Sequence, residues 1–67
     1  MADPVPTRVE RLLTLADLGV ALSIGRRKAW ELATTGTVPG FKIGREWRFR
    51  PDDVQAWIEA QASEATR

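Results

Sequence analysis

Residues 36–50 read GTVPGFKIGREWRFR, and this stretch decides the fold. Apolar and basic residues alternate over residues 41–43 and again over residues 47–50, which is the period of a half-buried β-strand. Residues 44–46 lie between the two runs and begin with glycine, which predicts a short hairpin loop. We expect the apolar members of the hairpin to face the core: Phe41, Ile43, Trp47 and Phe49. The basic members should face outward, with one at the tip: Lys42, Arg48, Arg50 and, at the tip, Arg45.

Two short helices are predicted before this hairpin and one after it. Thr14 can cap a helix over about 15–22, with Asp17 at the third position. A turn at residues 23–25 leads to a second helix over about 26–34, and Gly36 favours its end. Pro51 suits the first turn of a third helix, which should reach about residue 61. The sequence therefore predicts a small α+β fold, a winged helix-turn-helix: three helices, with a two-stranded antiparallel hairpin, the wing, between helix 2 and helix 3.

A chain of 67 residues makes one domain. We expect residues 1–11 to form a flexible N-terminal segment, residues 12–61 to form the folded domain, and residues 62–67 to be a short polar tail. The N-terminal residues do not read as a secretory signal, and no apolar run approaches the roughly 20 residues that span a bilayer. We therefore expect a cytoplasmic protein with no membrane partner.

Several kinds of chemistry are excluded by composition. The chain has no cysteine and no histidine, so it has neither a Cys/His zinc site nor a triad with a histidine base. Asp17, Asp52 and Asp53 stand in the first turns of predicted helices, where capping and the helix dipole explain carboxylates. We expect no catalysis, no metal, no cofactor and no small-molecule ligand.

Charge is strongly segregated along the chain. The net charge is only +1, yet residues 26–50 carry seven basic and two acidic side chains, a local charge of +5, and the remainder carries −4. Attraction to phosphate depends on the charge within about one Debye length, roughly 8–10 Å. The distribution therefore favours a polyanionic partner, double-stranded DNA.

The second helix places its polar residues on one side. Ala29, Leu32 and Ala33 cluster on the opposite, inward side. Cations at a helix N-terminus oppose the dipole, so three in a row call for a compensating phosphate or guanine edge. The candidate DNA-binding residues of this recognition helix are Arg26, Arg27, Lys28, Trp30 and Glu31.

Two of these candidates have alternatives. Trp30 could belong to the core, but its position on the polar side favours contact with sugar and phosphate. Glu31 could accept from a cytosine amino group, although an i,i+4 pair with Arg27 is favoured. In the wing, we expect Lys42, Arg45, Arg48 and Arg50 to reach the DNA backbone or the minor groove.

The order of elements and the residues that build it resemble a known family. The matching positions are Leu13, Thr14, Leu15, Asp17, Leu22, Ile24, Arg26, Trp30, Leu32, Gly36, residues 38–45, residues 47–49, Asp53, Val54, Trp57 and Ile58. This pattern, over residues 12–59, is similar to the small excisionase-type DNA-binding domains, relatives of the MerR-type winged helix in phage excisionases and AlpA-like regulators. Residues 36–44 are its most specific part. Gly25 departs from it, because family members usually carry Ser or Thr there as the helix cap.

The resemblance implies a function. A stand-alone excisionase binds repeated sites beside a phage attachment site in the bacterial host cell, bends the DNA and directs a partner integrase toward excision. Copies of such proteins often bind head to tail. A small AlpA-like transcriptional regulator on the same fold is the alternative. A protein-interaction module without DNA binding is a third possibility, which the +5 segment disfavours.

Overall fold

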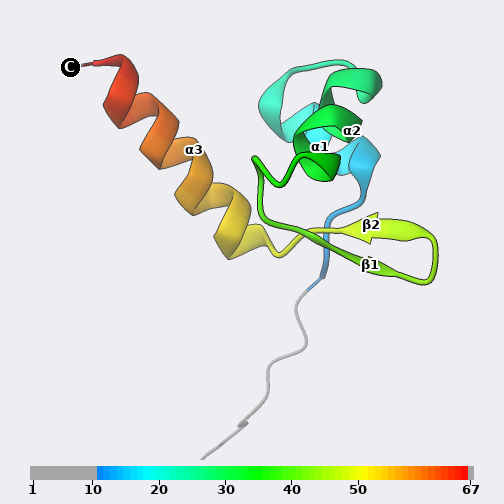
Figure 1. Cartoon of the computed structure of the whole chain (residues 1–67). Helices are drawn as coiled ribbons and strands as arrows, with labels where there is room; N and C mark the ends of the chain where they lie inside the picture. The colour runs from blue at the N-terminus through cyan, green and yellow to red at the C-terminus, as the bar shows by residue number, and fades with distance from the viewer. Residues whose placement is uncertain (1–10, 67) are drawn as a thin grey trace, which may run out of the picture.

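The computed structural model describes residues 11–66, and it confirms the predicted fold class. Its elements follow in the order α1 (Leu15–Leu22), α2 (Arg26–Thr34), β1 (Phe41–Ile43), β2 (Glu46–Arg48) and α3 (Pro51–Ala65). Helices α1 and α2 pack together beside the hairpin, and α3 follows directly from β2 (Figure 1). Most of the segment expected to be flexible, residues 1–10, lies outside the described residues.

The helix-turn-helix is set by local hydrogen bonds. A capping box opens α1: the Thr14 side chain accepts from the Asp17 backbone N–H, and the Asp17 carboxylate accepts from the Thr14 backbone N–H. The turn after α1 places Ser23 at a φ of 58°, so the left-handed conformation falls on this serine, whereas Gly25 has a φ of −73°. Gly25 is the N-cap of α2 and provides no side-chain cap hydrogen bond.

The core is small and lies where α1, α2 and the end of the hairpin meet. Its buried residues are Leu18, Ala29, Ala33, Val38, Phe49 and Val54. Ala29 and Ala33 present only methyl groups, so α1 and α2 can approach closely. Gly40 likewise lets the backbone before β1 lie close to the Phe49 ring, because a Cβ at this position would lie 2.5 Å from two carbons of that ring.

The hairpin forms as predicted, but its loop has two residues rather than three. Ile43 pairs with Glu46 across the loop of Gly44 and Arg45, and Gly44 adopts a φ of +65°. The shorter loop reverses the orientation of β1 relative to β2, because a slip of one residue exchanges the two faces of a strand. The prediction that Phe41 and Ile43 face the core with Trp47 and Phe49 was therefore wrong. Phe41 is 42% and Ile43 57% exposed.

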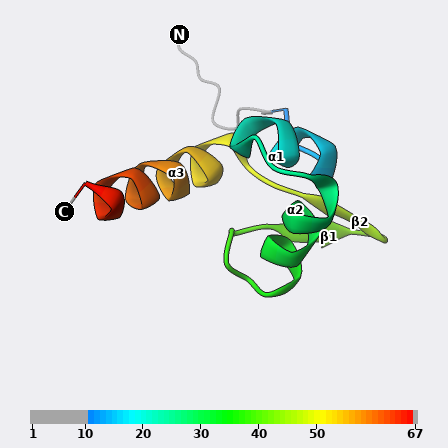
Figure 2. The same cartoon turned by 90° about the horizontal axis from the view of Figure 1, so that it is seen from above.

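The third helix is longer than predicted and projects from the domain. It runs to Ala65, about four residues past the expected end, so most of the segment expected to be a tail is helical. Val54 is buried near its start, and Trp57 is half-buried against the core rather than inside it. Two views at right angles show its C-terminal half extending away from the other elements (Figure 2). No helix within residues 11–66 is long and apolar enough to cross a membrane.

Candidate nucleic-acid interface

The three consecutive cations that begin α2 do not share one face, because each residue advances 100° around the helix. Arg26 lines a hollow beside the wing, together with Trp30 one turn later. Arg27 points outward with its side chain 91% exposed, and its Nε lies 3.7 Å from a carboxylate oxygen of Glu31. Lys28 lies on the other flank of the helix. The favoured interpretation of Glu31, a pair with Arg27, is therefore seen in the structure.

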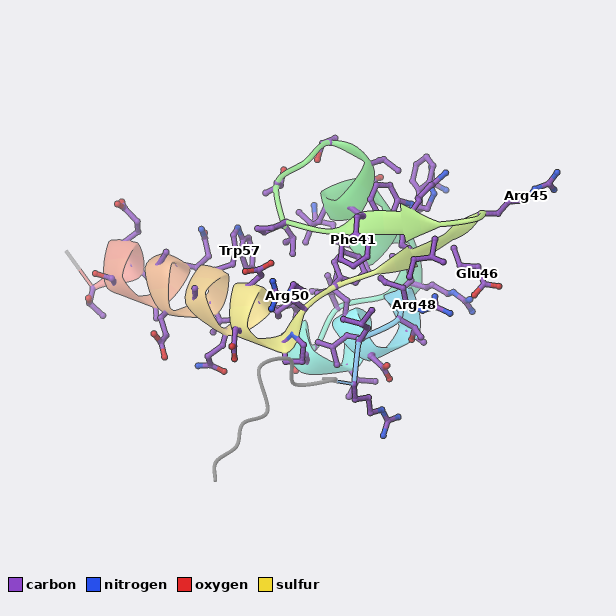
Figure 3. The ribbon with its side chains drawn as sticks, turned by 90° about the horizontal axis from the view of Figure 1, so that it is seen from below. Phe41, Arg45, Glu46, Arg48, Arg50 and Trp57 are labelled. Atoms are coloured by element: carbon purple, nitrogen blue, oxygen red, sulfur yellow. The ribbon has the colours of Figure 1, made fainter. Side chains whose placement is uncertain are left out.

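The wing presents its cations around one aromatic residue. Residue 42 stands opposite residue 47 in the hairpin register, and the Lys42 ammonium lies 5.5 Å from the centroid of the Trp47 ring. Trp47 in turn stacks on Phe49, with ring centroids 6.2 Å apart. Arg45 extends from the tip of the hairpin, away from the helices (Figure 3). The ring of Trp47 thus connects a surface cation to the core.

Arg48 is held by two hydrogen bonds to its neighbours in the wing. One terminal nitrogen donates to the Trp47 carbonyl at 2.8 Å, and the other donates to a carboxylate oxygen of Glu46 at 2.8 Å. Its side chain is only 28% exposed. Figure 3 shows Arg48 and Glu46 side by side along the wing, short of the tip.

These side chains border a single open hollow between α2, the wing and the start of α1. Its volume is about 450 Å³, and it brings together four cations and one carboxylate. The lining residues are Thr14, Leu15, Ala16, Arg26, Trp30, Lys42, Arg45, Glu46, Trp47 and Arg48. A concave surface with a net charge of +3 from these groups, and with exposed indole and aliphatic surface, suits the phosphates and sugars of a nucleic acid.

The start of α1 reaches this hollow because of one backbone pairing. The N–H of Leu13 donates to the carbonyl of Phe49 at 2.8 Å, and the N–H of Phe49 donates back to the carbonyl of Leu13 at 2.9 Å. The two hydrogen bonds fix the segment before α1 alongside the end of the hairpin. Thr14 and the first residues of α1 consequently form one wall of the hollow.

Five of the nine residues predicted from sequence gather at the hollow: Arg26, Trp30, Lys42, Arg45 and Arg48. Trp30 is 52% exposed, which excludes the alternative that it belongs to the core. Arg27 and Glu31 lie on the outer surface of α2. Arg50 lies at the start of α3, away from the tip of the wing (Figure 3).

Lys28 has a different environment from the rest. It lines a mainly apolar groove of about 570 Å³ between the α1–α2 pair and α3, whose other residues are Ala21, Leu22, Ile24, Leu32, Thr37, Trp57, Ile58 and Gln61. The sequence did not point to two further parts of the lining of the hollow, which are the acidic residue Glu46 and the first residues of α1. The alternation of the strands could not reveal Glu46, because it was assigned to the loop.

One carboxylate near the hollow has a perturbed pKa. The backbone N–H of Thr14 donates to Asp17 and is the main cause that lowers the pKa of this side chain, and the positive charges of Arg11 and Arg48 contribute in the same direction. Asp17 therefore stays ionised at neutral pH and completes the cap of α1.

An exposed helix start and a basic hairpin tip on either side of one hollow define a winged helix-turn-helix domain of the DNA-binding class. The helix-turn-helix domain family matches residues 12–62, and the chain belongs to this family. No curated protein and no solved structure matches the chain.

Proposed function

We propose that this protein is an excisionase-type recombination directionality factor. It binds specific sites near a phage attachment site, bends the DNA and directs a partner integrase toward excision. The observation that carries the DNA-binding part is the hollow, where Arg26 of α2 and Arg45 of the wing border the same concave surface. The excisionase part rests on the resemblance of residues 12–59 to that class of small DNA-binding domains.

The docking follows from the two basic elements. The N-terminal residues of α2 enter the major groove, as recognition helices of this class do, and Arg26 and Arg27 reach base edges. The wing then lies over the adjacent backbone, with Arg45 in or near the minor groove. Lys42 and Arg48 contact phosphates on the way, and Trp30 packs against a sugar. Lys28 and Arg50 lie further out and reach the DNA only where it bends toward them, whereas Glu31 faces Arg27 and makes no contact with the DNA.

Several copies bind in tandem, head to tail, while the free protein is a monomer. A domain of this size covers only roughly 600–1,000 Å² of protein surface on DNA, so one copy binds weakly and contact with a neighbour raises occupancy. The exposed apolar pair of the wing, Phe41 and Ile43, offers one surface for such a contact. The apolar groove beside α3, lined in part by Trp57, offers a second on another side of the same copy.

The test begins with the DNA that flanks the gene. Footprinting should reveal protected repeats beside an attachment site, and duplexes with one, two and three repeats should show increasing affinity per site. Adding the purified protein to the integrase encoded nearby should switch the reaction from integration to excision. Protection confined to a promoter, with no effect on recombination, would instead identify a transcriptional regulator. Equal affinity per site at every repeat number, or a stable dimer in sedimentation, would exclude the tandem arrangement.

A further inference from the structure

Glu46 is the one acidic residue among the charged side chains that line the hollow; the other four are cations. It borders the hollow with Arg26, Lys42, Arg45 and Arg48, and in the chain it directly follows the arginine at the tip of the wing. A carboxylate at such a position repels DNA phosphates. Attraction to a polyanion therefore does not explain an acidic residue at this position. The contacts of Glu46 with its neighbours do explain it.

The contact of Glu46 with Arg48 is a directed hydrogen bond. The Oε1 atom of Glu46 accepts from one terminal nitrogen of Arg48 at 2.8 Å, while the Trp47 carbonyl accepts from the other at 2.8 Å. A guanidinium carries five N–H donors in a fixed plane. When two acceptors on neighbouring residues hold two of its nitrogens, the plane is fixed and the remaining N–H groups keep one direction.

The chain offers a natural contrast in the recognition helix. Glu31 also faces an arginine, but Arg27 Nε stands 3.7 Å from its carboxylate and the Arg27 side chain is 91% exposed. That distance exceeds the range of a hydrogen bond, and exposed ion pairs of this kind contribute little. Arg48 is 28% exposed and hydrogen-bonded twice. The two acids of the basic segment therefore differ in what they do to their arginines.

We propose that Glu46 is a positioning residue of the interface: it holds the Arg48 guanidinium in the orientation in which Arg48 binds a DNA phosphate. An arginine that is already ordered loses less side-chain conformational entropy on binding. This smaller entropy loss outweighs the repulsion between one exposed carboxylate and the DNA. The role of Glu46 rests on the proposed DNA binding, in which a phosphate accepts from the remaining N–H donors of Arg48.

The experiment compares four proteins on one duplex that carries the footprinted site: wild type, Glu46→Ala, Glu46→Gln and Glu31→Ala. Each is titrated at the same salt concentration, and its melting temperature is measured alongside. Glu46→Ala should bind about 2- to 10-fold more weakly than wild type although it removes a negative charge. Its log–log salt slope should also shrink by about 0.9 as Arg48 loses its phosphate. Glu46→Gln keeps an oxygen acceptor for Arg48 and should bind at least as well as wild type.

The matched control is Glu31→Ala, which removes the same charge from the same basic segment and should bind more tightly than wild type. If Glu46→Ala also binds more tightly, Glu46 acts only through its charge and the proposal is wrong. An Arg48→Ala background gives a second test, since Glu46→Ala should no longer weaken binding there. An equal loss with and without Arg48 would overturn the proposal. Failure of the wild-type protein to bind any duplex would instead refute the proposed function itself.

Discussion

Replacing Gly40 with alanine should destabilise the domain through steric clashes of the added Cβ. The added Cβ would stand 2.5 Å from both Cδ2 and Cε2 of Phe49 and 3.2 Å from the carbonyl oxygen of Arg48. Carbon atoms in contact prefer about 3.5–4.0 Å, so the ring or the strand must move by about 1 Å. Phe49 is fully buried and the backbone of Arg48 belongs to β2, so neither can move freely. Gly40 does not adopt a left-handed φ, which leaves packing as the cause.

Overpacked cores of this kind lose about 1–3 kcal/mol. In a domain of this size, 1 kcal/mol corresponds to about 4–8 °C in melting temperature. A loss of about 2 kcal/mol should therefore lower the melting temperature by about 8–16 °C, measured by circular dichroism at 222 nm. The matched control is Gly25→Ala, where a Cβ meets no atom within 4 Å among the described residues, so any loss of stability there comes from the N-cap of α2 and not from packing. A Gly40→Ala protein that melts within about 2 °C of wild type would refute the reasoning.

Four further predictions concern binding and pH. The log–log salt slope of DNA binding should be about −4.5 if five cations each release one phosphate counterion, and a slope near zero in gel-shift titrations would exclude a polyanionic partner. Arg26→Ala should lose about 1–3 kcal/mol of affinity for the target and much less for random duplex, and equal losses would make Arg26 a phosphate contact. Arg45→Ala should weaken binding without lowering the melting temperature, because the tip of the wing lies outside the core; the opposite result would make the tip structural. The pKa of Asp17 is lower in the folded than in the unfolded chain, so its stabilisation is present above pH 4 or so and disappears as the pH falls through the folded pKa. Asp17→Asn should therefore lose less stability than wild type between pH 5 and pH 2 or so in acid titrations of the melting temperature.

The sequence was sufficient for those parts of the fold that depend on local signals. Thr14 and Asp17 predict the start of α1, and the capping box forms as expected. Gly36 likewise marks the end of α2, because a residue with positive φ ends a helix. Pro51 marks the start of α3, because the fixed φ of proline suits the first turn of a helix.

The wrong prediction concerns the hairpin, where a shift of one residue in strand register decides which side chains face the core. The sequence predicts a three-residue loop, GRE, but Glu46 belongs to β2, and this shift of one position turns Phe41 and Ile43 to the solvent. Alternation shows that two residues share a face without showing which face, and that choice depends on tertiary pairing. Lys28 is a different case, because helix geometry alone predicts its flanking position. A rotation of 200° from Arg26 carries it to the flank beside α3, away from the hollow that Arg26 lines.

The pairing of Leu13 with Phe49 also bears on how the domain folds. These residues are 36 positions apart along the chain, so their two backbone hydrogen bonds close a loop that contains α1, α2 and the wing. Closing a loop of that length costs more conformational entropy than forming contacts between residues close in sequence. This pairing should therefore form late, after the helices have packed. Until it forms, the wing and the start of α1 have no fixed distance between them. A partly folded chain therefore carries all the residues that line the hollow, but the wall formed by the start of α1 is not yet held beside the wing.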